Sequence, residues 1–162
     1  MMSWRCPASL DIYRPNGTPF IHRRLPVKIR SPLHAVETST GNYVISHAWE
    51  NSWTWTVSEV TADGSLVRSF LPSHHSLYFN WPRHLSIDSR DRIFVADCEN
   101  DRICVVYDQL SSGEVLLSRI IRPERLHFDE DEGQLLIACF EGKLSVCDLA
   151  RPIVSFRSVV AL

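Results

Sequence analysis

The feature that most constrains this chain is a pair of similar segments about 41 residues apart. Residues 81–88 and 121–129 share four positions, and each matched pair is separated by 41 residues. The pairs are Pro82/Pro123, Leu85/Leu126, Ile87/Phe128 and Asp88/Asp129. A period of this length indicates a repeat protein, because a single unit of ~40 residues cannot bury its apolar face alone.

A short apolar run follows each of these segments. The runs are residues 93–96 and 135–138, and a third, looser copy that begins at Pro32 has its run at residues 43–46. They are rich in β-branched and aromatic residues and lie between polar turns, which favours strands over helices. Both faces of each run are apolar, as in a strand that is covered on both sides. This pattern predicts the inner strands of a β-propeller, whose blades pack face to face.

Two further strands are expected in each copy. Alternating segments predict the third strands at residues 55–60, 103–108 and 144–147, and the outer strands are expected at 66–70, 115–121 and 153–160. Two strands at residues 10–13 and 20–25 precede the first copy. We therefore predict an all-β, partial (open) propeller of about three and a half four-stranded blades. Residues 1–30 form the outer strands of an incomplete first blade, and the other blades are residues 31–80, 81–121 and 122–162.

Residues 82–108 closely resemble an NHL repeat. The matching features are Leu85-Ser86-Ile87-Asp88, an apolar run that ends in Ala96-Asp97, Asn100, and a Val-rich strand that begins with Arg102-Ile103. The segment has Asp91 where the family has glycine and Asp101 where the family has histidine. Residues 123–149 and 32–60 resemble the family more weakly. WD-repeat and kelch arrays fit less well, because their Trp-Asp ending and paired glycines are absent.

The resemblance implies a function similar to that of the NHL regions of tripartite-motif proteins. Such a region is expected to be a non-catalytic module that binds a protein partner through propeller loops, as part of a ubiquitin-ligase-like scaffold. Recognition of RNA on the same surface is the first alternative. The second is a hydrolase or lyase in the propeller channel, although the metal, Arg and Tyr set of the related lyases cannot be traced in this sequence.

The best candidates for the partner-binding surface are aromatic and basic residues at one end of the blades. Trp53 and Trp55 lie with Trp49 in a predicted loop between two strands, and exposed aromatic loops are common in binding surfaces. Trp81 and Arg83 precede an inner strand, and Arg122 and Arg125 occupy the matching region of the next copy.

No metal, cofactor or catalytic residue is predicted. The acidic residues 129–132 lie in one tight turn and cannot all face one ion, and the spacing of the histidines matches no zinc motif. His34 and His84 occupy the same repeat position, where a structural or channel-lining side chain is expected. Three of the cysteines lie in strand patterns, and acidic neighbours of Cys98 are expected to raise its thiol pKa.

The composition is that of a globular protein that creates no strong electrostatic field. The net charge is −2, which provides no long-range attraction for nucleic acid or anionic lipid. The five cysteines form no CxxC pair and residues 1–10 lack the apolar run of a signal peptide, so a reduced thiol state and a cytoplasmic location are expected.

The number of blades raises a further expectation. NHL propellers close with about six blades, and three and a half blades leave strand edges and apolar faces open. We therefore expect a truncated product, a fragment of a longer chain, or self-association of two copies.

Overall fold

The computed structural model describes residues 8–49, 54–70, 77–149 and 155–160. In these ranges the chain is almost entirely β-strand, and the one helical element is a single 3₁₀ turn, η1 (Cys98–Asn100). No helix in the described ranges is long and apolar enough to cross a membrane.

The strands form four antiparallel sheets, which we number as blades 1 to 4. Blade 1 is a hairpin of β1 (Ser9–Tyr13) and β2 (Pro19–Arg24). Blade 2 contains β3 (Ile29–Glu37), β4 (Tyr43–Trp49), β5 (Trp55–Val60) and β6 (Leu66–Ser69). Blade 3 contains β7 (Pro82–Ile87), β8 (Ile93–Asp97), β9 (Arg102–Tyr107) and β10 (Ser112–Ser118). Blade 4 contains β11 (Pro123–Asp129), β12 (Gln134–Cys139), β13 (Lys143–Asp148) and β14 (Ser155–Val160).

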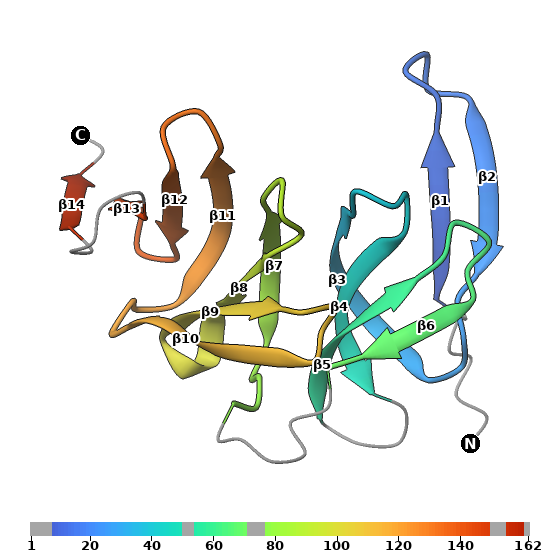
Figure 1. The fold of residues 1–162 in the computed structure, drawn as a ribbon, viewed down its shortest axis with the longest axis horizontal. Helices are drawn as coiled ribbons and strands as arrows, with labels where there is room; N and C mark the ends of the chain where they lie inside the picture. Colours follow the sequence, from blue (N-terminus) through green and yellow to red (C-terminus); the bar gives the residue numbers. More distant parts are fainter. Residues whose placement is uncertain (1–7, 50–53, 71–76, 150–154, 161–162) are drawn as a thin grey trace.

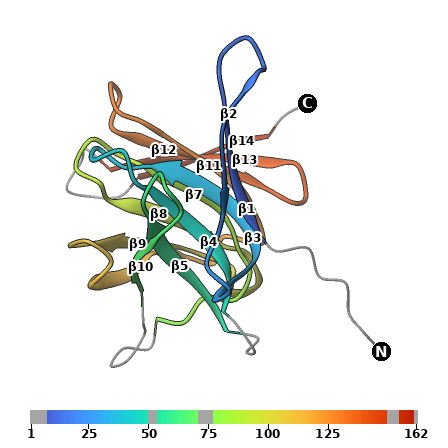
Figure 2. The ribbon, with the colours of Figure 1, turned by 90° about the vertical axis from the view of Figure 1, so that its right-hand side faces the viewer.

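The blades follow one another in chain order along a row. Blade 1 and blade 4 lie at opposite ends of the row in Figure 1, and Figure 2 looks along it, with the sheets one behind another. The first strands of blades 2, 3 and 4 are neighbours, because β7 contacts both β3 and β11. In a propeller these first strands surround the channel. The prediction of a partial, open β-propeller is confirmed.

The hydrophobic core is divided among the spaces between blades. One cluster lies between blades 2 and 3 and includes Val57, Leu85 and Val95. A second lies between blades 3 and 4, and a smaller third cluster joins blade 1 to blade 2. The apolar run of β8 contributes to two of these clusters, because Val95 faces blade 2 and Phe94 faces blade 4. This explains why the run does not alternate.

The repeated Asp position closes the turn between the first two strands of a blade. The Asp88 Oδ1 atom accepts the backbone N–H groups of Arg90 and Arg92, at 3.0 and 2.8 Å. Asp91 then adopts a left-handed conformation, with φ 59°, which explains why glycine is suited to this position. Asp129 repeats the role, since its Oδ1 atom accepts the N–H groups of Asp131 and Glu132.

Two details differ from the sequence-based expectation. Strand β10 begins at Ser112 rather than at residue 115, because residues 108–110 all take left-handed φ values and make the turn earlier. Trp49 was expected in a loop but is the last residue of β4, whereas Trp55, expected both with that loop and in the strand 55–60, is the first residue of β5.

Candidate functional site

The NHL-like signature residues form a buried network at one end of blade 3. The Asp97 side chain is fully buried and accepts three hydrogen bonds, from the Asn80 backbone N–H, Asn100 Nδ2 and Arg102 Nε. The distances are 2.7, 2.8 and 2.7 Å. Burial raises the pKa of Asp97, and the three donors oppose this rise by stabilising the carboxylate.

This network fixes the segment that leads into blade 3. Asn100 Nδ2 and Arg102 Nη2 both donate to the Tyr78 carbonyl oxygen, at 3.1 and 2.6 Å. The Cys98 N–H donates to the Trp81 carbonyl oxygen at 3.2 Å. Trp81 itself has a positive φ of 63°, a conformation that a bulky residue keeps only when its surroundings hold it. Tyr78 and Trp81 are therefore fixed in place by the blade beneath them.

The start of blade 4 is fixed in the same way by the turn after η1. The Asp101 carbonyl oxygen accepts the Ile120 N–H at 2.9 Å, and its Oδ1 atom accepts the Arg122 N–H at 2.9 Å. The Arg122 guanidinium lies over the Phe140 ring, 4.3 Å from its centroid. A cation above an aromatic face is attracted to it, so Phe140 is also restrained.

These contacts hold four large hydrophobic residues at the surface of one end of the blades. Their exposed fractions are 62% for Tyr78, 43% for Trp81, 56% for Ile121 and 57% for Phe140. We refer to this surface as the aromatic end. Ordered, exposed hydrophobic side chains at one end of a fold are typical of a binding surface.

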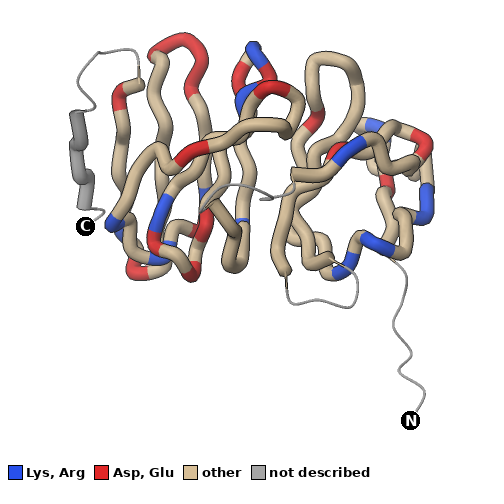
Figure 3. Tube along the Cα trace, turned by 60° about the horizontal axis from the view of Figure 1, so that its bottom comes forward, with Lys and Arg blue, Asp and Glu red and all other residues tan. Residues whose placement is uncertain are grey.

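Arg83 and Arg122 at the aromatic end are paired with carboxylates. Arg83 Nη1 lies 3.2 Å from Glu124 Oε1, and Arg122 Nη2 lies 3.6 Å from Glu99 Oε1. Figure 3 shows basic and acidic residues interleaved along the loops of the blades. This local charge balance disfavours phosphate binding, which depends on cations free to neutralise the phosphates.

The structure brings together only some of the residues that the sequence suggested. Trp55 and Trp81 are in contact, with ring centroids 5.3 Å apart, and Arg83 and Arg122 lie at the same end of the blades. Arg125 is separate, because it lies on the inner strand β11 and its charge acts on His34 and His84. Trp53 lies outside the described residues.

Sequence reasoning missed Tyr78, Ile121 and Phe140. Tyr78 lies four residues before β7, Ile121 lies two residues before β11, and Phe140 follows β12 directly. The repeat could have indicated them. A large apolar residue that lies outside the predicted strands cannot pack in the core between blades and is therefore expected at the surface.

His34 and His84 line the inner strands and link successive blades. His34 Nδ1 accepts the Leu85 N–H and His84 Nδ1 accepts the Leu126 N–H, each at 3.3 Å. Burial lowers the pKa of both rings, to about 4 for His84, whose value is lowered further by His34 and Arg125. The expectation of a structural or channel-lining role fits this geometry better than a ligand role.

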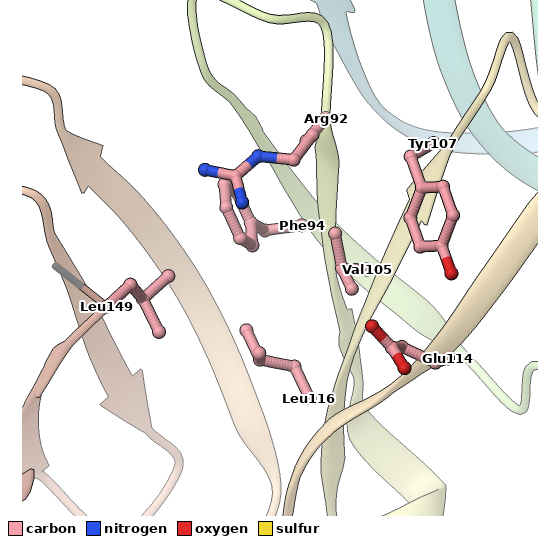
Figure 4. Close-up of a pocket in the computed structure, with 7 residues that line it drawn as sticks. All are labelled: Arg92, Phe94, Val105, Tyr107, Glu114, Leu116 and Leu149. Carbon is pink, nitrogen blue, oxygen red and sulfur yellow. The ribbon is translucent and has the colours of Figure 1, made fainter. Parts of the chain in front are cut away.

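A groove of about 380 Å³ opens between blades 3 and 4. Its floor is apolar, formed by Phe94, Val105, Leu116 and Leu149, and Arg92, Tyr107 and Glu114 complete its lining (Figure 4). Blades diverge as they extend from the channel, which opens a wedge of this kind. The Arg92 guanidinium is paired with Asp88 through Nε at 2.5 Å and lies over the Phe94 ring. The apolar floor of the groove can accommodate an apolar side chain.

Within the described ranges, no group of three or more His, Cys, Asp or Glu residues could hold a metal ion. The four described cysteines are buried, and burial raises the pKa of each, to about 12 for Cys104. The rise expected for Cys98 is therefore confirmed in direction, with burial as its main cause and Glu99 as a smaller one.

The folded arrangement belongs to the β-propeller class, and solved structures of that class resemble it. The luciferin-regenerating enzyme has a TM-score of 0.68 and 14% identity, over 95% of this chain and 56% of that one. Virginiamycin B lyase from Staphylococcus aureus has a TM-score of 0.65 and 14% identity, over 93% and 48%. A protein of unknown function from Bacteroides caccae has a TM-score of 0.61 and 16% identity, over 94% and 54%.

These similarities establish the fold alone. The chain spans about half the length of these three structures. No known protein family and no curated protein matches the sequence. The NHL resemblance therefore stays a prediction.

Proposed function

We propose that this chain is a non-catalytic interaction module that binds a protein partner at the aromatic end of its blades. The observation that carries the proposal is the set of four exposed, restrained hydrophobic residues Tyr78, Trp81, Ile121 and Phe140. Aromatic and arginine side chains dominate the energetics of protein interfaces, and side chains that are already ordered lose little entropy on binding. Trp55, Arg83 and Arg122 surround the set and would extend the surface.

RNA recognition is the second candidate at the same surface, because bases stack on exposed aromatic rings. It is less favoured, since Arg83 and Arg122 are paired with Glu124 and Glu99. The protein-binding proposal agrees with the implied similarity to tripartite-motif proteins, and a ubiquitin-ligase-like scaffold is the context that this similarity suggests.

Site-specific photo-crosslinking in the native host tests the proposal. A benzophenone amino acid replaces Trp81 in one variant and Tyr13, which is 59% exposed on blade 1, in the control. We expect a discrete protein adduct from position 81 that is unaffected by ribonuclease and absent from position 13. The absence of an adduct at position 81, or equal adducts from both positions, would overturn the proposal.

A titration with random RNA at several salt concentrations separates the two candidates. Binding that weakens steeply with salt, and that is lost when Tyr78 and Trp81 are both replaced by alanine, would favour RNA. We expect no such binding.

A further inference from the structure

The outward face of blade 4 repeats a face that blade 3 buries completely. Four positions of blade 3 on this face are Phe94, Ala96, Ile103 and Val105, and all are buried in the cluster shared with blade 4. The strand pairings place Phe94 opposite Val105 and Ala96 opposite Ile103, so the four share one face.

Blade 4 has an equivalent face, formed by the residues at the same positions of its strands. The pairings there place Leu136 opposite Val146 and Ala138 opposite Leu144, at the same positions of the sheet. All four are only half-buried, and in Figure 1 blade 4 stands at the end of the row with no described sheet beyond it. Blade 4 therefore presents an apolar face that, by the geometry of blade 3, is shaped to receive another blade.

The inner strand of blade 4 differs from that of blade 3 because it carries basic residues where blade 3 has hydrogen-bond acceptors. In blade 3, His84 Nδ1 and Ser86 Oγ accept the N–H groups of Leu126 and Phe128 from the next blade. Arg125 and His127 hold the same positions in blade 4, because they pair with Ala138 and Leu136, and both are exposed. A guanidinium cannot accept a hydrogen bond, so this edge is suited to a partner that carries a carboxylate.

The other end of the row offers such a partner. Leu126 and Phe128 are the residues of β11 that face blade 3, and the equivalent positions of blade 2 are Ala35 and Glu37 on β3. Ala35 and Glu37 are both exposed, because the hairpin of blade 1 covers Ile45 and Val60 but not this part of β3. The uncovered part of β3 in blade 2 therefore presents the carboxylate of Glu37.

We propose that a second copy of this chain docks head to tail on the outward face of blade 4, with Glu37 of one copy beside Arg125 and His127 of the other. At the inner strands the contact repeats the one between β7 and β11, and its charges are complementary. A head-to-tail contact closes into a ring when the copies together complete a full rotation. The chain spans 56% and 48% of the luciferin-regenerating enzyme and virginiamycin B lyase, so two copies supply about the length of one ring.

Sedimentation velocity of the 162-residue chain tests this arrangement. We expect the wild type to sediment as a dimer of twice 18.6 kDa and to form no larger species, because the two contacts close the ring. Leu144→Glu should yield a monomer, whereas Val67→Glu, at a 40% exposed position of β6, should leave the dimer intact. A wild-type monomer at all concentrations, or open-ended oligomers, would overturn the proposal.

Charge exchange provides a second test that does not depend on core packing. Glu37→Arg and Arg125→Glu should each raise the dimer dissociation constant about tenfold or more, and the double variant should recover most of the loss. Arg90→Glu is the matched control, since Arg90 is exposed in the turn after β7, and it should have no effect. Failure of the double variant to recover dimerisation, with both single variants folded by circular dichroism, would contradict the pairing of Glu37 with Arg125.

Discussion

The imidazole rings of His34 and His84 stack with their centroids 3.7 Å apart, across the boundary between blades 2 and 3. Each Nδ1 atom accepts a backbone N–H from the inner strand of the following blade. A ring that accepts at Nδ1 is neutral and carries its proton on Nε2. The two histidines thus act as a hydrogen-bonded link from blade 2 through blade 3 to blade 4, and the link exists only while both rings are unprotonated.

Stability should therefore fall as the solution becomes acidic. The pKa values of His34 and His84 are lowered from 6.5, chiefly by burial, so the unfolded chain binds more protons than the folded chain below this pH. The stabilisation is complete above about pH 6.5 and is lost as the pH falls towards about 4, the value for His84. Urea unfolding between pH 4 and 8 measures this dependence.

The variant His34→Gln/His84→Gln is the test of this assignment. Glutamine retains an acceptor but does not titrate, so the decline between pH 6.5 and 4 should become shallower. Buried His47, whose pKa is also lowered by burial, accounts for part of the remaining slope. An unchanged slope in the double variant would assign the acid sensitivity to other groups.

Replacement of Asp97 should be among the most destabilising single changes. Asp97→Ala removes the acceptor of the Arg102 Nε–H and the Asn80 N–H, and the Asp97 side chain that it removes is fully buried. Loss of one partner from a buried ion pair costs about 3–5 kcal/mol of unfolding free energy. Chemical denaturation gives the value. Glu130→Ala is the control, because among the described residues its exposed carboxylate accepts only from Ser89, and its loss should cost about 1 kcal/mol or less.

The four described cysteines should be unreactive in the folded protein. Cys98, Cys104, Cys139 and Cys147 are buried and their pKa values are raised, so little thiolate is present at neutral pH. We expect iodoacetamide to modify these four sites only after unfolding in guanidinium chloride, as read by peptide mass spectrometry. Rapid modification of Cys98 in the native state would indicate that η1 opens readily.

Replacing exposed side chains of the aromatic end by alanine should weaken partner binding more than it lowers the stability of the fold. Tyr78→Ala and Phe140→Ala remove exposed side chains, so each should change the unfolding free energy by about 1 kcal/mol or less. Each should reduce the adduct from position 81 about tenfold or more if it is a binding hot spot. Phe20→Ala, at a 57% exposed position of blade 1, should leave the adduct unchanged.

The sequence by itself determined the repeat and the strands of each blade. The spacing of 41 residues and the turn closed by Asp88 depend on neighbours in sequence or on the adjacent strand, and the apolar run of β8 can be recognised from its residue types alone. Such features follow from local hydrogen bonding and from the alternation of side chains across a sheet. For the same reason the partial propeller could be predicted without the structure.

Only the tertiary structure decided what the individual residues do. The sequence identified Asp97, Asn100 and Arg102 as a family signature, but not that they fix Tyr78 and Asn80. It grouped Arg125 with Arg83 and Arg122, although an inner-strand position separates Arg125 from the aromatic end. These relationships join residues that lie apart in the sequence, and they depend on how loops and strands pack in three dimensions, which no periodicity in the chain encodes.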